Sequence, residues 1–356
     1  MPLLDAPEQI CNALPCAPSI EKTIAKARQS VINILEKKDR RYLVIVGPCS
    51  IHHVDSAIAY AKKLREKALE HSDTLHIIMR AYLEKSRTKM NWKGFVYDPD
   101  CDGSNNIKKG IYEGRSLLLE INKLGMPVAM EMVSPFVAPY LADLITWGAI
   151  GARTTESQLH RELAAQLPFP LGIKNTTGGN ILSAIDAAEI ATHPQTLMGI
   201  NHAGILSLIQ TPGNPYCHVV LRGSTAGANY DENTVQKTCE QLRARKQIDR
   251  VMIDCSHGNA QKEIQRQYTA ATTIIERIRS GHPHYLGLML ESHLNPGQQL
   301  LTFDAKPHAE FSITDPCLGW ENTVLLLDKL SSAIKEGDKA FQQRKHQRVS
   351  TILTVG

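Results

Sequence analysis

The chain has 356 residues, enough for one large domain or two of ordinary size. Hydrophobic residues make up 42%, charged residues 21%, and the formal net charge is +4, which favours a globular protein and argues against a disordered chain or a nucleic-acid coat. The chain has no run of ~18 uninterrupted apolar residues, no evident secretory signal and no CxxC pair among its eight cysteines. We therefore expect a cytoplasmic enzyme with free thiols that binds neither membranes nor nucleic acids.

Short apolar runs rich in Val, Ile, Leu and Met recur along the chain, with helical patterns between them. Such runs are typical of parallel strands that are covered on both faces. The expected strands are Leu43–Val46, Leu75–Arg80, Val128–Glu131, Ala149–Arg153, Leu171–Lys174, His218–Arg222, Arg250–Asp254 and Leu286–Leu290. Two further runs, Leu197–Ile200 and Ile205–Gln210, lie so close together that we assign them to an extra hairpin near 197–210.

Amphipathic helical patterns precede and separate these strands. Ser19 is expected to open an N-terminal helix that ends near Leu35, and Asp55 is expected to cap the helix after the first strand. The other expected helices begin near Ile107, Ile181, Val235 and Ile264, and a last one covers Val324–Ile334.

Strands that alternate with helices over about 300 residues favour a (β/α)8 TIM barrel over an open doubly wound sheet. No repeat or linker divides the chain, so we expect one catalytic domain. Residues 1–41 form its N-terminal extension with a helix, residues 42–335 the barrel, and residues 336–356 a basic C-terminal tail.

Positively charged side chains gather at the expected strand ends, where a TIM barrel carries its active site. Arg80, Arg153, Lys174 and Arg222 stand there, and Lys85 and Arg87 follow in one loop. Arginine and lysine bind carboxylate and phosphate oxygens, so this set indicates a small, multiply anionic, phosphorylated substrate. The alternative is that the strands simply end in solvated cations.

A second set of strand-end residues has the donor atoms of a metal site. Its members are Cys49, His257, Glu291 and, after the last strand, Asp315. A thiolate, an imidazole and two carboxylates suit Mn, Fe, Co or Zn better than Mg or Ca. A single cysteine is more often a buried small hydrophobe and a single histidine an ordinary hydrogen-bonding group, so the residues alone leave the metal site open.

The motifs around these residues resemble those of the type I, feedback-regulated 3-deoxy-D-arabino-heptulosonate 7-phosphate (DAHP) synthases. The matching segments occur in family order over roughly residues 15 to 335. They are VGPCSIH (Val46–His52), EKSRTKMNWKG (Glu84–Gly94), WGAIGARTTESQ (Trp147–Gln158), GIKN (Gly172–Asn175), HVVLRG (His218–Gly223), MIDCSHGN (Met252–Asn259), ESHL (Glu291–Leu294) and SITDPCLGW (Ser312–Trp320).

The resemblance implies an aldol-like condensation of phosphoenolpyruvate (PEP) with D-erythrose 4-phosphate that releases phosphate, the first step of the shikimate pathway. It also implies a homodimer or homotetramer and one divalent metal ion, Mn2+, Fe2+, Co2+ or Zn2+. Its metal ligands would be Cys49, His257, Glu291 and Asp315. PEP would contact Arg80, Lys85, Glu131, Gly151, Ala152, Arg153, Lys174 and Arg222, and erythrose 4-phosphate would contact Arg87 and Thr88.

Proton transfer can be assigned in more than one way. Lys85 is our candidate donor to the nascent alkoxide, and Asp315 or a metal-bound water is the alternative. Together with Cys49 and His257, these two residues form the expected catalytic set.

The chain departs from the family pattern at several positions. Ser86 replaces the proline of the family's Lys-Pro-Arg-Thr segment, Thr176–Gly179 replace Gly-Thr-Asp-Gly, and Cys255 stands where the family usually has Phe. The segment Met132–Pro139 also differs, so we expect weak or altered feedback inhibition by Phe, Tyr or Trp. Two alternatives remain: a PEP-dependent synthase that uses another aldose phosphate, and a catalytically weak regulatory paralogue.

Overall fold

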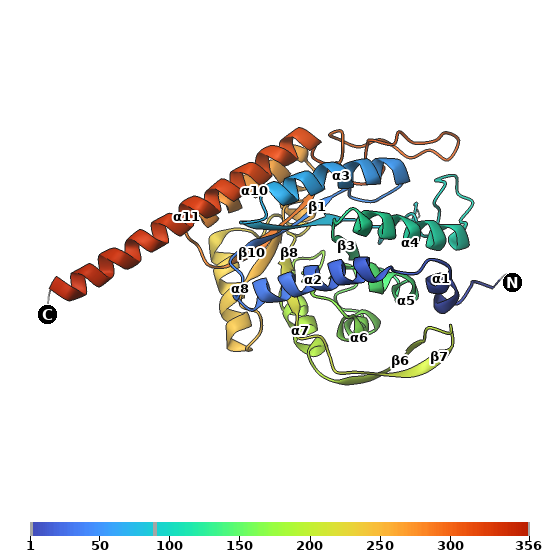
Figure 1. Cartoon of the computed structure of the whole chain (residues 1–356), viewed down its shortest axis with the longest axis horizontal. Coiled ribbons are helices and arrows are strands. Elements are labelled where there is room, and N and C mark those ends of the chain that lie inside the picture. The colour runs from blue at the N-terminus through green and yellow to red at the C-terminus, as the bar shows by residue number, and fades with distance from the viewer. Residues whose placement is uncertain (1–2, 88–90, 355–356) are drawn as a thin grey trace.

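The computed structural model describes residues 3–87 and 91–354, with side chains up to residue 337. Within them, parallel strands close into a barrel in the order β1-β10-β9-β8-β5-β4-β3-β2, which confirms the expected TIM barrel (Figure 1). The barrel strands are β1 (Tyr42–Gly47), β2 (Leu75–Arg80), β3 (Val128–Glu131), β4 (Trp147–Ile150), β5 (Leu171–Lys174), β8 (Cys217–Leu221), β9 (Val251–Asp254) and β10 (Tyr285–Glu291).

The predicted bounds of β2, β3 and β5 are confirmed to the residue, and most others shift by one residue or two. The strand expected at Ala149–Arg153 is wrong at both ends, because β4 starts at Trp147 and stops at Ile150. Beyond it, the Gly151 carbonyl accepts hydrogen bonds from the Thr154 amide at 3.0 Å and the Thr155 hydroxyl at 3.0 Å. These bonds turn the chain away from the sheet.

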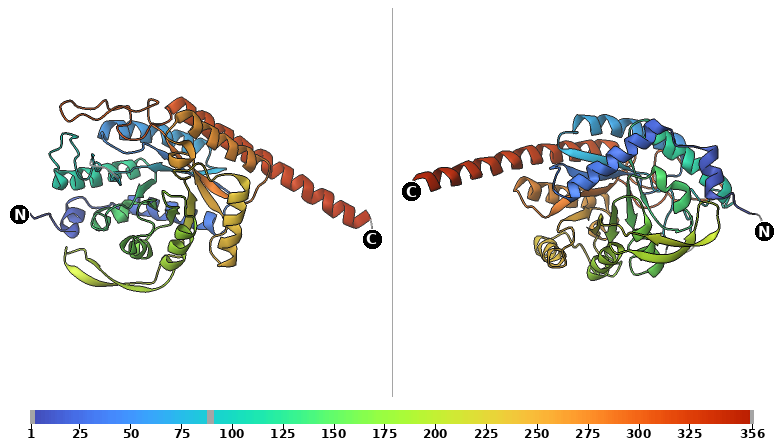
Figure 2. Two further views of the ribbon diagram at one scale, coloured as in Figure 1. Left: turned by 180° about the vertical axis from the view of Figure 1, so that it is seen from behind. Right: turned by 60° about the horizontal axis from the view of Figure 1, so that its bottom comes forward.

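Helices surround the barrel in all three views (Figures 1 and 2). They are α1 (Pro7–Ala13), α2 (Pro18–Leu35), α3 (Val54–Glu70), α4 (Ile107–Lys123), α5 (Ala138–Leu141), α6 (Gln158–Gln166), α7 (Leu182–Ala191), α8 (Glu232–Ala244), α9 (His257–Ala260), α10 (Ile264–Arg279) and α11 (Trp320–Thr354), with a short 3-10 helix at Ala142–Leu144. The sequence patterns did not predict α1, α5, α6, α9 or the 3-10 helix.

Both predicted helix caps are wrong. The N-cap of α2 is Ala17 and Pro18 occupies the first turn, where its missing N–H costs nothing. The N-cap of α3 is His53, whose side chain accepts a hydrogen bond from the Ser56 amide at 3.4 Å.

The extra hairpin is confirmed as an antiparallel sheet of its own. It consists of β6 (Gln195–Ile200) and β7 (Leu206–Thr211), and it lies outside the ring of helices (Figure 2).

Side chains fill the barrel at the end opposite to the strand ends that carry the charged residues. Leu43 and Ile45 of β1 point into the interior cluster, whereas Val44 and Val46 join the cluster under the helices, as the alternation of a strand requires. The C-terminal end of α2 packs on the interior cluster, and Lys37 just beyond it pairs with Asp249 before β9 at 2.6 Å. Therefore α2 covers the N-terminal ends of the strands and leaves the C-terminal ends for a site.

The last helix is longer than the predicted Val324–Ile334. It packs on α10 through buried residues up to Ile334, and its backbone continues past the barrel to Thr354, through most of the expected tail (Figure 1). Among the described residues, no helix is long and apolar enough to cross a membrane.

Candidate active site

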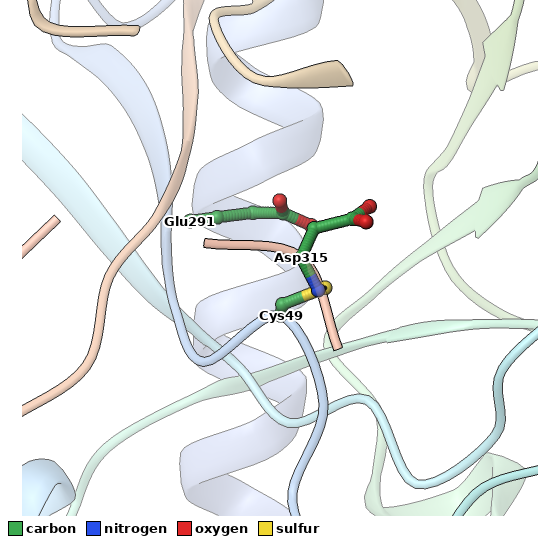
Figure 3. A group of neighbouring side chains, drawn as sticks. All are labelled: Cys49, Glu291 and Asp315. Atoms are coloured by element: carbon green, nitrogen blue, oxygen red, sulfur yellow. The ribbon is translucent and has the colours of Figure 1, made fainter. Parts of the chain in front are cut away.

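Three of the four expected metal ligands form one cluster at the C-terminal rim of the barrel (Figure 3). Cys49 follows β1, Glu291 ends β10, and Asp315 lies in the loop before α11. One donor atom from each lies within 4.8 Å of the other two.

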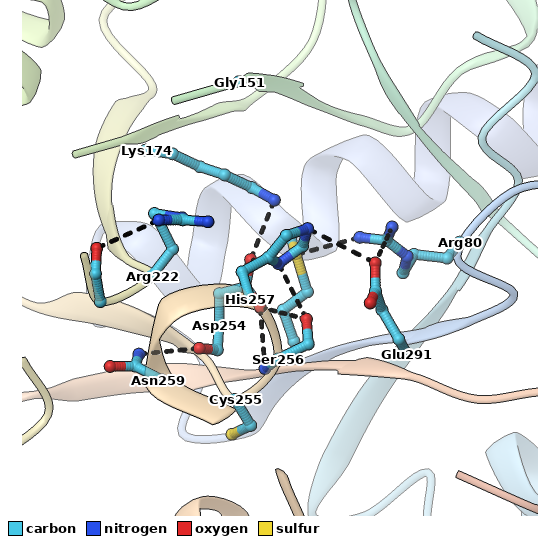
Figure 4. A network of polar contacts seen from close by, with 12 residues as sticks. Arg80, Gly151, Lys174, Arg222, Asp254, Cys255, Ser256, His257, Asn259 and Glu291 are labelled. Carbon is cyan, nitrogen blue, oxygen red and sulfur yellow. Dashed lines mark hydrogen bonds and ion pairs between the residues drawn. The ribbon is translucent and has the colours of Figure 1, made fainter. Parts of the chain in front are cut away.

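His257, the fourth expected ligand, reaches the same cluster from the start of α9. Its Nε2 lies 3.5 Å from Oε1 of Glu291 (Figure 4). The residue has φ +52°, a left-handed conformation that non-glycine residues keep only where the surroundings hold it. The strained backbone aims the imidazole at the carboxylate.

The electrostatics of this cluster suit a cation. Burial and the charge of Glu291 together raise the pKa of the Cys49 thiol to about 11, although the charge of Lys85 lowers it. Burial alone would raise the pKa of Asp315, but the charges of Lys85, His257 and Lys262 hold it well below its ordinary value. A buried thiol, an imidazole and two carboxylates fit a divalent transition metal, whose charge would also stabilise the thiolate.

Lys85 lies against the cluster and connects it to the loop after β2. Its Nζ donates to the Cys49 carbonyl at 3.1 Å and to the Cys49 sulfur at 3.2 Å. Arg87, two residues on, donates from Nε to the Trp92 carbonyl at 3.0 Å. Thr88 lies outside the described residues.

Arg80 is fully buried beneath the cluster. Its guanidinium donates to Oε1 of Glu291 at 2.9 Å and to the Cys49 carbonyl at 3.2 Å, and it stacks 3.8 Å from the ring centre of Tyr82. Arg80 therefore uses several of its N–H groups to hold Cys49 and Glu291, two expected metal ligands, in place. Sequence reasoning did not assign this role to Arg80.

Lys174 ends β5 and is joined to the metal cluster through Asp254, the last residue of β9. Its Nζ lies 2.9 Å from Oδ2 of Asp254, and the same oxygen lies 2.9 Å from Nδ1 of His257 (Figure 4). Burial would raise the pKa of Asp254, but these two partners hold it well below the ordinary value. Sequence reasoning missed Asp254.

Glu131 ends β3 and lies beside Gly151, which follows the neighbouring strand β4. A side-chain carbon at Gly151 would lie 2.3 Å from Oε1 of Glu131, so a larger residue there would displace this carboxylate. Ala152 and Arg153 follow in the turn after β4, Ala152 partly buried and Arg153 exposed.

The remaining expected cations, Arg87, Arg153 and Arg222, influence one another electrostatically. Burial lowers the pKa of both Arg87 and Arg222, and the nearby charge of Arg153 lowers them further. Because these arginines repel one another, a bound anion would lower their electrostatic energy.

Comparison with known proteins agrees with this geometry. The model of the DAHP synthetase I family matches residues 20–328. The chain belongs to this family.

Its relatives have similar length and fold. The chain is 42% identical over 335 residues to the Tyr-sensitive phospho-2-dehydro-3-deoxyheptonate aldolase of Escherichia coli, covering 92% of each. It is 43% identical over 326 residues to the tyrosine-inhibited enzyme of Schizosaccharomyces pombe, covering 90% of this chain and 88% of that one. The solved structure of the phospho-2-dehydro-3-deoxyheptonate aldolase of Francisella tularensis superposes with a TM-score of 0.91 at 40% identity, covering 95% of this chain and 98% of that one.

The structure shows the surroundings of two departures from the family pattern. The Lys85 amide donates to the Lys93 carbonyl at 2.9 Å, so a backbone bond closes the loop that carries Ser86 in place of proline. Cys255 is fully buried in the core outside the barrel, and its sulfur points away from His257 (Figure 4).

Proposed function

We propose that this family member is a DAHP synthase, which condenses PEP with D-erythrose 4-phosphate to give DAHP and phosphate. The observation that supports it best is that one barrel rim combines a metal-type donor cluster with a set of cations. The two sets meet at Lys85 and Arg80, each of which contacts Cys49. A binding protein has no need for this combination.

In this proposal, cations of the rim hold the carboxylate and phosphate of PEP. Lys174 and Arg222 supply charge to the phosphate side, with Arg153 at the turn after β4. Arg80, already paired with Glu291, contributes charge from beneath, and Lys85 lies between this pocket and the donor cluster. Fixed charges in these positions orient C3 of PEP toward the aldehyde.

A divalent metal ion held by Cys49, His257, Glu291 and Asp315 would supply Lewis acidity to the aldehyde oxygen. Mn2+, Fe2+, Co2+ and Zn2+ all suit this donor set. Arg87, with Thr88, receives the phosphate of erythrose 4-phosphate. As the new bond forms between C3 of PEP and the aldehyde carbon, Lys85 donates a proton to the nascent alkoxide. Water then adds to C2 and gives up one proton, which restores the protonated Lys85. The C2–O bond to phosphate breaks to leave the ketone, and the second water proton leaves with the phosphate.

The deciding experiment measures PEP consumption after chelator treatment, with and without Mn2+. Erythrose 4-phosphate, arabinose 5-phosphate and ribose 5-phosphate are compared as acceptors. We expect Mn2+-dependent turnover with erythrose 4-phosphate alone. Turnover with only a five-carbon acceptor would assign the chain to another PEP-dependent synthase, and metal binding without any turnover would favour a regulatory paralogue.

We also propose that the chain forms a homo-oligomer in the cytoplasm. Met198, Leu206 and Leu208 on the hairpin are 79%, 70% and 71% exposed, an apolar face that association would cover. All eight cysteines are free thiols, which fits a reducing compartment. Light scattering of the native chain should give a dimer or tetramer, and Leu208→Lys should lower the mass. A monomeric native chain would contradict the proposal.

Weak feedback inhibition is the third part of the proposal. A largely apolar cavity of about 900 Å3 lies beside the hairpin, and its wall includes Pro135 and Phe136 of the segment that departs from the family pattern. We expect turnover to persist in micromolar Phe, Tyr or Trp. Strong inhibition by micromolar Phe or Tyr would contradict this expectation.

A further inference from the structure

Asp254 contacts both functional sets of the rim, although sequence reasoning assigns it to neither. It ends β9, its side chain is fully buried, and its Oδ2 lies 2.9 Å from Lys174 Nζ and 2.9 Å from His257 Nδ1. Lys174 belongs to the proposed PEP site and His257 to the proposed metal site. A single oxygen atom therefore joins the two sites.

The other oxygen of Asp254 fixes the orientation of the carboxylate. Oδ1 accepts from the Ser256 hydroxyl at 2.6 Å and from the Ser256 amide at 3.1 Å. The Ser256 hydroxyl oxygen also lies 2.9 Å from Nδ1 of His257. Because the Ser256 hydroxyl proton is already donated to Oδ1, this oxygen can only accept, so Nδ1 of His257 carries the proton of that contact. In the neutral imidazole, Nε2 then keeps its lone pair, which is the tautomer that a metal ligand needs.

We propose that Asp254 is a positioning residue that couples metal binding to PEP binding, an inference that rests on the proposed function. If His257 held a metal ion, its imidazole would be polarised and its hydrogen bond to Oδ2 would be stronger. Asp254 would then neutralise less of the Lys174 charge, and an anionic substrate would bind more tightly to Lys174. Linkage makes the effect reciprocal, so bound PEP should tighten metal binding by the same factor.

The test uses Asp254→Asn, which keeps the shape of the side chain and removes its charge. Binding of Mn2+ is followed by electron paramagnetic resonance of the free ion, and PEP binding by calorimetry with and without Mn2+. We expect Mn2+ affinity to fall about 10- to 100-fold, the usual effect of losing the hydrogen-bond partner of a metal-binding histidine. PEP affinity of the metal-free protein should stay at or above the native value, because a negative charge beside Lys174 is gone. Addition of Mn2+ should raise the PEP affinity of Asp254→Asn by a smaller factor than it raises that of the native chain.

The matched control is Asp249→Asn. Asp249 lies just before the same strand at the opposite end of the barrel, where it pairs with Lys37 and Arg243, so the charge change is identical. This variant should keep native affinity for both ligands. If Asp254→Asn does not fold, Ser256→Ala takes its place and should weaken Mn2+ binding while leaving PEP binding by the metal-free protein intact.

Native Mn2+ affinity in Asp254→Asn, or an equal loss of Mn2+ and PEP affinity, would overturn the coupling role. The proposed function is judged separately on the native chain. If the native chain bound Mn2+ and formed DAHP while the variant showed either of those results, only the inference about Asp254 would fail. A native chain that bound neither ligand would defeat the proposed function and this inference with it.

Discussion

Single buried polar residues carry much of the chemistry at the rim and much of the pH sensitivity of the barrel. Lys85 contacts the Cys49 sulfur at 3.2 Å, and His218 lies fully inside the barrel, where its Nε2 accepts from Trp147 Nε1 at 3.2 Å. The surroundings of each residue favour one protonation state, the charged form of Lys85 and the neutral form of His218. Replacing either side chain should therefore have a measurable effect.

Replacing Lys85 with methionine should lower kcat by about 10^2- to 10^4-fold, the usual contribution of a positioned proton donor. The measurement is steady-state turnover with erythrose 4-phosphate at saturating Mn2+. Lys93→Met is the control, because Lys93 is exposed on the same loop. A loss below tenfold in Lys85→Met would rule out Lys85 as the donor.

The native chain should lose stability as the pH falls from about 6.5 to about 4. Burial lowers the pKa of His218 from 6.5 to about 4, so over this range the unfolded chain takes up a proton that the folded chain refuses. His218 alone should lower the free energy of unfolding by about 3 kcal/mol at pH 4. His76 and His293, whose pKa values burial also lowers to about 4, add to the decline.

Urea unfolding at pH 7 and pH 4.5 checks the share of His218. The His218 ring also contacts the Tyr216 carbonyl through Nδ1 at 3.1 Å. His218→Gln, whose amide can accept from Trp147 and donate to that carbonyl without titrating, should show a shallower decline than the native chain. His193→Gln, at an exposed position, should match the native decline. Equal declines in all three proteins would mean that His218 does not titrate as described.

At the scale of elements, the sequence predicted strands better than helix ends. The strands are apolar runs whose ends coincide with a change to polar or charged residues, as at Arg80 and Lys174, so their bounds are visible in composition. Helix starts depend on single hydrogen bonds: the cap of α3 is an unusual histidine, and α2 starts with a proline. Short elements such as α5 and α9 span too few residues to show a helical period.

The last helix yields a prediction because its last described buried residue, Ile334, lies well before the end of the helix at Thr354. Leu330 is 1% exposed and packs in the core, and the helix continues for about five turns beyond Ile334. Truncation after Gly337 should leave turnover and Tm close to native values. Leu330→Ala should cost about 2–5 kcal/mol of unfolding free energy in urea melts. A truncated chain that lost its activity would show that the extension acts on the barrel.

For the whole molecule, the rule that TIM barrels carry their sites at strand ends placed most of the rim from the sequence. It found Cys49 and Glu291, which the structure brings together. It missed Asp254, because His257, just beyond β9, already accounts for that strand end, and the contacts of Asp254 with Lys174 and His257 appear only in the structure. It also could not show that Arg80 contacts Glu291, since the two residues lie far apart in sequence and only barrel closure joins them.

Metal binding should stabilise the entire fold, because the ligands come from segments as distant as β1 and the loop before α11. Mn2+ at about 100 times its dissociation constant should add about 2.7 kcal/mol, seen as a rise in Tm that depends on Mn2+ concentration. Chelator treatment should reverse the rise. Cys49→Ser should shift the response to higher Mn2+ concentrations, and an unchanged Tm in the native chain would contradict a metal site at this rim.

The closure of the barrel by β1 and β10 has a consequence for folding during synthesis on the ribosome. Val46 and Gly47, at the end of β1, pair with Leu290 and Glu291, at the end of β10, so Cys49 meets Glu291 only after most of the chain has been synthesised. Asp315 emerges later still. A nascent chain therefore cannot bring the proposed metal ligands together during most of translation, and metal binding at this rim would have to follow the pairing of the first and last strands of the barrel.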